Sequence, residues 1–137
     1  MLDQPIDDLI DRVLEEHIAI RRDLAEAGAL MDVARLRPVF QALRDELLEH
    51  LLKEERVLFP WIRSGRGATA VGPIRAMGWE HDATLAQIAR LRELTSGYRA
   101  PDPAAAPLFA CLERLDRGLR AHIELENDVL FPRALGR

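Results

Sequence analysis

Two copies of one motif decide the fold of this chain: residues 50–60 read HLLKEERVLFP, and residues 122–132 read HIELENDVLFP. Six of the eleven positions are identical, namely a histidine, a glutamate four residues later and a closing Val-Leu-Phe-Pro. Four residues of an α-helix advance about 6 Å and turn by about 400°. The histidine and the glutamate of each copy are therefore expected to lie one turn apart on the same face of a helix.

The sequence around these motifs has the hydrophobic rhythm of four amphipathic helices. Glycine and proline interrupt this rhythm at Gly28, at residues 64–72 and at residues 96–101. No run of alternating β-branched residues competes with it. We therefore predict an all-α fold, an antiparallel up-down-up-down four-helix bundle, formed by residues 1–137 as a single domain. The expected helices span residues 5–27, 36–59, 73–95 and 103–131.

Several residues carry expectations about the ends and faces of these helices. Asp3 and Asp102 are the expected N-terminal caps of the first and fourth helices. Pro60 is expected to end or kink the second helix, because proline lacks the backbone N–H that a helix interior needs. Val57 and Val129 are expected on the inward faces of their helices.

The four histidines of the chain fall at one level of the predicted bundle. Counted along each helix from the prolines at one end, all four lie roughly 12 to 18 Å from that end. The predicted layer contains four imidazoles and two carboxylates on otherwise apolar faces, and buried groups of this kind are costly unless something pairs them. We therefore predict a metal site, and a metal-free interaction bundle with a duplicated helix is the alternative. The predicted metal ligands are His17, His50, Glu54, His81, His122 and Glu126.

The ligand types favour iron. Six ligands without a thiolate are too many for a tetrahedral structural zinc site. Imidazole and carboxylate suit iron, and carboxylates from opposed helices can bridge two ions. We expect two iron ions in an oxo- or hydroxo-bridged di-iron centre, with two zinc or two manganese ions as the alternatives.

Composition excludes several classes of protein. The 19 basic residues are mixed with 23 acidic ones at a net charge of −4, so nucleic acid is not an expected partner. No apolar stretch approaches the roughly 20 residues of a membrane-spanning helix, so a membrane is not expected either. The single cysteine, Cys111, and an acidic amino terminus favour the cytoplasm.

The motifs resemble those of the hemerythrin-like (HHE cation-binding) family, and within it the di-iron repair-of-iron-centres (RIC) proteins. The resemblance covers nearly the whole chain and also includes residues 77–82 and 133–135 and the pair His17 and Arg21. It implies a four-helix bundle whose non-haem di-iron centre is bridged by two glutamates. It also implies reaction with nitric oxide, oxygen or peroxide, or supply of iron to damaged iron-sulfur client proteins, under nitrosative or oxidative stress. The alternative is a module that binds or senses oxygen or nitric oxide without turnover.

The sequence departs from the family in two places and from the oxygen-carrying hemerythrins in a third. Residues 18–49 contain no histidine where the family usually has one, so Glu26, Glu16, water or nothing takes that place. Met77 stands where oxygen-carrying hemerythrins have an extra histidine, which makes reversible oxygen carriage less expected. The short cysteine-bearing domain of full-length RIC proteins does not occur in the sequence, which counts against iron donation to a client.

Further residues have two possible roles each. Arg21 is expected either to place a charge beside the cluster or to be solvated. Gly118 is expected to allow close packing, or else to leave room for gas to reach the metals. Trp79 is expected to pack in the core or a loop, with a redox role as the alternative. Cys111 is expected to be a small core residue too far from the histidines to bind the metals.

Overall fold

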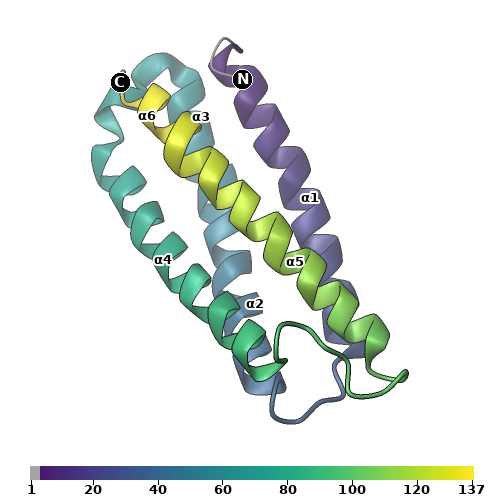
Figure 1. Cartoon of the computed structure of the whole chain (residues 1–137). Helices are drawn as coiled ribbons and strands as arrows, with labels where there is room; N and C mark the ends of the chain where they lie inside the picture. The colour runs from purple at the N-terminus through teal and green to yellow at the C-terminus, as the bar shows by residue number, and fades with distance from the viewer. Residues whose placement is uncertain (1–3) are drawn as a thin grey trace.

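A computed structural model describes residues 4–137 of the chain. Four long helices run alternately up and down (Figure 1). No strand occurs among the described residues, so the predicted all-α, up-down-up-down four-helix bundle is confirmed. The long helices are α1 (Ile6–Leu30), α2 (Arg37–Lys53), α4 (Val71–Leu94) and α5 (Ala106–Leu125).

The helices pack in two close pairs. Helix α1 lies along α5 and α2 lies along α4, while α1 meets α2 and α4 meets α5 less extensively. The two motif-bearing helices, α2 and α5, are therefore diagonal, and both run toward the end of the bundle where the C-terminus lies (Figure 1). This is the arrangement that the predicted up-down-up-down topology gives its second and fourth helices.

Two hydrophobic clusters lie on either side of a polar layer. On α1, Val13 belongs to the cluster nearer the C-terminus and Ile20 to the cluster nearer the α1–α2 loop, with the buried His17 between them. Phe40 and Phe109 are fully buried in the loop-side cluster, and Phe59 and Phe131 in the other. The polar layer is therefore enclosed on both sides by packed side chains.

Each motif contains a π-helical turn that begins at its glutamate. The turns span Glu54–Leu58 and Glu126–Leu130, and they lead into the short helices α3 (Phe59–Trp61) and α6 (Phe131–Ala134). The N–H of Phe59 donates to the carbonyl of Glu54, five residues earlier, and Phe131 pairs with Glu126 in the same way. Such turns occur in proteins mostly as single insertions at functional sites.

The π turn corrects two expectations. Helix geometry does not end at Pro60, because the backbone keeps helical angles from the π turn through Phe59 and continues in α3 to Trp61. Val57 is 54% exposed rather than buried, since the wider turn rotates the next residues and brings Leu58 and Phe59 inward instead. Val129, in the second copy, is partly buried against the C-terminal cluster.

The helix ends differ from expectation by a few residues. Helix α1 continues through Gly28 to Leu30 and stops where Met31 turns extended. The predicted loop 64–72 is mostly helical turns, Ile62–Arg66 and the 3₁₀ turn Gly67–Thr69, with a break at Gly65, whose φ is 82°. The carboxylate of Asp102 accepts a hydrogen bond of 2.9 Å from the N–H of Ala105, just before α5 begins. Asp3 lies outside the described residues.

No helix among residues 4–137 combines the length and apolarity that crossing a membrane requires.

Candidate metal centre

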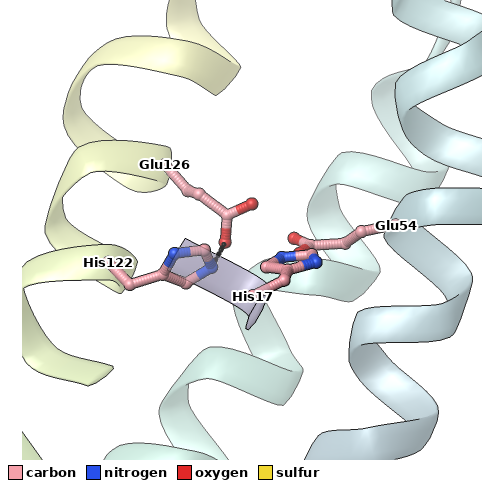
Figure 2. Close-up of side chains that lie close together, drawn as sticks. All are labelled: His17, Glu54, His122 and Glu126. Carbon is pink, nitrogen blue, oxygen red and sulfur yellow. Dashed lines mark hydrogen bonds and ion pairs between the residues drawn. The ribbon is translucent and has the colours of Figure 1, made fainter. Parts of the chain in front are cut away.

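The structure brings all six predicted ligands together in one buried layer. The four histidines come one each from the four long helices, and the two glutamates open the π turns. Glu54 and Glu126 are 0% exposed, and none of the histidines is more than 3% exposed. Figure 2 shows His17, Glu54, His122 and Glu126 converging from three separate segments of the bundle.

The six residues form two groups of four that share both glutamates. His17 and His122 form one group with the glutamates, called here the first position, and His50 and His81 form the other, the second position. Within each group the potential ligand atoms all lie within 4.8 Å of one another. The paired imidazole rings have centroids 5.1 Å apart at the first position and 4.9 Å apart at the second.

Each glutamate touches a histidine of both positions. Glu54 Oε1 lies 3.1 Å from His17 Nε2, and its Oε2 lies 3.3 Å from His50 Nε2. Glu126 Oε1 lies 3.0 Å from His81 Nε2 and 3.2 Å from His122 Nε2. Both carboxylates are therefore shared by the two four-residue groups.

Most inward atoms of the cluster lack hydrogen-bond partners. They include Nε2 of three histidines, Oε2 of Glu54 and both carboxylate oxygens of Glu126. Buried polar atoms are rarely left in this state unless an ion satisfies them. Imidazole nitrogens and carboxylate oxygens that face one another at about 3 Å suit a shared cation, so these residues fit a bound metal.

Every histidine is oriented by a hydrogen bond from its outer nitrogen. His17 Nδ1 donates to Glu55 at 2.6 Å and His50 Nδ1 to Glu80 at 2.9 Å. The remaining two bonds are both 2.8 Å long, from His122 Nδ1 to Glu16 and from His81 Nδ1 to Asn127. With Nδ1 as the donor in this way, the Nε2 of each ring faces the centre.

Arg21 is not simply solvated. Its guanidinium donates two hydrogen bonds to Glu55, at 2.6 and 2.9 Å, and so extends the chain of contacts outward from His17. Lys53 donates to Glu80 at 3.0 Å in the same way. Sequence reasoning missed Glu55, Glu80 and Asn127, although each of them adjoins a predicted ligand in the sequence.

Burial and hydrogen bonding shift the pKa values of the cluster. Burial lowers the pKa of His17 to about 4 and lowers that of His50, so both rings are neutral at pH 7. Burial also lowers the pKa of His122, but hydrogen bonds to Glu126 and Glu16 outweigh it and raise the value to about 9. Burial and the nearby Glu126 carboxylate raise the pKa of Glu54. The two neutral rings therefore have lone pairs available to a metal ion.

The phenylalanines of the two motifs cover the layer. The Phe59 ring lies 5.8 Å from the His17 ring, and the Phe131 ring stacks on His81 at 5.9 Å and 5°. Together with the C-terminal hydrophobic cluster they exclude bulk water from that side of the histidines. The Phe of Val-Leu-Phe-Pro thus belongs to the site as well as to the core.

Neither protein candidate for the missing histidine reaches the centre. Glu26 pairs with Arg114 at 2.7 Å, and Glu16 binds the outer nitrogen of His122. Cys111 is buried beside Asp23 and Glu26, apart from the six residues of the layer. Arg114 also donates to Asp23 at 3.1 Å, so its guanidinium already pairs with both carboxylates beside Cys111.

Two further expectations are wrong. Trp79 does not pack in the core, because its side chain is 67% exposed on α4. Gly118 does not allow close packing, because it is exposed and an added Cβ would meet no atom within 4 Å.

Comparison with known proteins agrees with this geometry. The family described as hemerythrin HHE cation binding domain matches residues 8–134. The iron-sulfur cluster repair protein DnrN of Neisseria gonorrhoeae is 40% identical over 124 residues, which cover 88% of this chain and 79% of that protein.

Two longer relatives match over a shorter stretch. The iron-sulfur cluster repair proteins YtfE of Dickeya chrysanthemi and Pectobacterium atrosepticum are 43% and 42% identical over 96 and 97 residues. These matches cover 68% and 69% of this chain but only 43% and 44% of the relatives, so the chain aligns with less than half the length of the YtfE proteins. With the family match spanning all four helices and both motifs, the chain belongs to the hemerythrin HHE cation-binding family.

Proposed function

We propose that the chain is a non-haem di-iron protein that acts in the repair of damaged iron-sulfur clusters. In this role it reacts with nitric oxide, oxygen or peroxide, supplies iron, or does both, under nitrosative or oxidative stress. The observation that carries the proposal is the pair of four-residue groups sharing both glutamates, with inward atoms that have no other partner. The names of the relatives, iron-sulfur cluster repair proteins, support the biological context.

The proposed ligands form two sets, one for each ion. His17 and His122 would hold one iron, His50 and His81 the other, and Glu54 and Glu126 would bridge them. Two iron ions held there would supply redox chemistry toward small oxidants and nitric oxide, or iron itself as cargo.

The residues around the proposed ligands orient the imidazoles and keep water from one side of them. The outer hydrogen bonds fix the rotation of each imidazole and present Nε2 inward. The phenyl rings of Phe59 and Phe131 keep water from one side, which favours small uncharged molecules such as nitric oxide over bulky or charged ones.

The proposal also covers the domain organisation, the partners and the cellular compartment of the protein. Residues 1–137 would act as one HHE domain, with damaged iron-sulfur proteins as partners. The cytoplasm is the proposed compartment, because a single buried cysteine needs no oxidising environment.

The test uses a purified iron-sulfur dehydratase inactivated by nitric oxide or peroxide. Incubation with the iron-loaded chain is expected to restore its activity, or the loaded chain is expected to consume nitric oxide or peroxide over many turnovers in a separate electrode assay. Glu126→Ala should lose both effects, and Glu124→Ala, which removes an exposed glutamate two residues away, should keep them. One-time uptake of nitric oxide without turnover or repair would favour the sensing alternative and contradict the proposal.

A further inference from the structure

The duplicated motif allows the two metal positions to be compared residue by residue. A pseudo-twofold relation exchanges α1 with α4 and α2 with α5, and with them the two positions. Under this relation Glu16 corresponds to Glu80, since each directly precedes a histidine and accepts a hydrogen bond from another helix. Glu55 corresponds to Asn127, since each directly follows a shared glutamate and accepts from a histidine of another helix. Three of the four outer partners are therefore carboxylates, and the fourth is a neutral amide.

The difference between Glu55 and Asn127 is accompanied by a second difference between the two halves. In one half, Arg21 stands one turn after His17 and forms the two hydrogen bonds to Glu55. In the other half the residue one turn after His81 is Leu85, which has no charge to offer. The Arg21–Glu55 ion pair is thus replaced as a unit by Leu85 and Asn127. His81 therefore has an uncharged outer partner, with no arginine one turn further along its own helix.

The type of outer partner affects how strongly a histidine binds a metal. A carboxylate that accepts Nδ1–H makes the imidazole more basic and strengthens its Nε2 as a ligand, and loss of such a partner typically weakens metal binding 10- to 100-fold. An amide oxygen carries only a partial charge and does this less. At the first position both histidines have carboxylate partners, whereas at the second position only His50 does.

We infer that the two metal positions are inequivalent, that the second position releases its ion first, and that the neutral amide of Asn127 sets this difference. The inference rests on the proposed function, because it concerns two bound iron ions.

Surface pockets favour the same position. A pocket of about 350 Å³ is lined by His50 and Glu80, and another of about 400 Å³ is lined by Asn127. The exposed Trp79 lines both, so the two pockets flank one side of the second position. Next to the first position, a pocket of about 160 Å³ reaches Glu16 but no histidine. Among these pockets, only the one at the second position is lined by a histidine of the cluster, His50.

The experiment measures iron release. The chain is loaded anaerobically with iron(II), its iron content is determined, and an excess of a coloured ferrous chelator is added. Wild type is expected to lose one iron at least about tenfold faster than the other. Asn127→Asp, which has nearly the same shape but supplies a carboxylate to His81, should slow the fast phase about tenfold and leave the slow phase unchanged. Glu16→Gln should accelerate the slow phase alone, because it removes the carboxylate partner of His122.

Asp128→Asn is the matched control. It changes charge one residue further along the same π turn, at an exposed side chain, and should alter neither phase. Equal release rates for the two irons of wild type, or an unchanged fast phase in Asn127→Asp, would overturn the inference while leaving the proposed function standing. An iron content below two before chelation would instead overturn the proposed function, and this inference with it. If Asn127→Asp does not fold, the release rates of Glu16→Gln test the inference instead. Acceleration of the fast phase in Glu16→Gln would contradict it.

Discussion

At the scale of single residues, the convergence of the four histidines and two glutamates could be predicted from sequence, but the hydrogen-bond partners of the histidines' outer nitrogens could not. His50 and Glu54 share a face of one helix by spacing alone, so their convergence follows from helical geometry. Glu80 and Glu16 bind histidines on other helices. Those contacts depend on the rotation of each helix about its axis, which hydrophobic periodicity determines only coarsely.

A second buried polar cluster, away from the metal layer, is centred on Asp116. The side chain is 2% exposed and accepts hydrogen bonds from Arg92, Arg120 and the hydroxyl of Tyr98. Burial raises the pKa of Asp116, but these hydrogen bonds outweigh burial and lower the pKa overall. This carboxylate links α4, the turn after it and α5 at the loop end of the bundle.

Asp116→Asn is expected to reduce stability in a pH-dependent way. Because the pKa of Asp116 is lower in the folded chain, its contribution is complete above the ordinary aspartate pKa of about 4 and is lost as pH falls through the lowered value. The variant should lose about 2 kcal/mol at pH 7, and the difference from wild type should shrink toward pH 2. Urea unfolding at both pH values measures this, with the exposed Asp45→Asn as control. A difference that stays constant down to pH 2 would contradict the role assigned to the carboxylate.

At the scale of elements, the helices were predictable but the π turns were not. The apolar rhythm of residues 50–60 fits an ordinary helix, and it places Val57 inward. The structure exposes Val57 because the turn that begins at Glu54 contains one residue more than an α-helical turn. Hydrophobic periodicity cannot reveal an inserted residue over a single turn. The repetition of this turn at Glu126 places both shared glutamates in matching local geometry.

The segments that follow the two motifs meet at Gly67. A Cβ at this position would lie 2.6 Å from the carbonyl oxygen of Ala134, at the end of α6, so only glycine fits without a backbone shift. We expect Gly67→Ala to destabilise the chain by about 1 to 3 kcal/mol. Gly72→Ala, early in α4, should be neutral or stabilising because an added Cβ there meets no atom within 4 Å. Thermal unfolding of both variants tests this contact, and equal melting temperatures would contradict it.

At the scale of the whole molecule, the topology followed from four amphipathic helices joined by loops, which predict an up-down-up-down bundle. In such a bundle the second and fourth helices, which carry the two motifs, are diagonal and parallel, as observed. The two hydrophobic clusters fold the bundle, while the polar layer between them leaves buried atoms without partners. The layer therefore lowers stability until an ion binds it.

Iron is accordingly expected to stabilise the whole bundle. Free iron(II) at about 100 times its dissociation constant adds about 2.7 kcal/mol for one site, which corresponds to a rise of roughly 5–10 °C in melting temperature for a chain of this size. Anaerobic calorimetry with and without iron(II) measures the shift. The stabilisation should be absent from Glu126→Ala and retained in Cys111→Ala. A wild-type melting temperature that does not respond to iron would contradict the link between the layer and stability.

The most direct test of the central claim, that two ions share Glu54 and Glu126, is the iron content of the chain. The protein is loaded anaerobically with ⁵⁷Fe(II), desalted, analysed for iron and examined by Mössbauer spectroscopy. Wild type is predicted to retain two irons per chain, and Glu54→Ala and Glu126→Ala are each predicted to lose the dinuclear signal. One iron or less per chain in wild type, or a dinuclear signal that survives either substitution, would contradict the account.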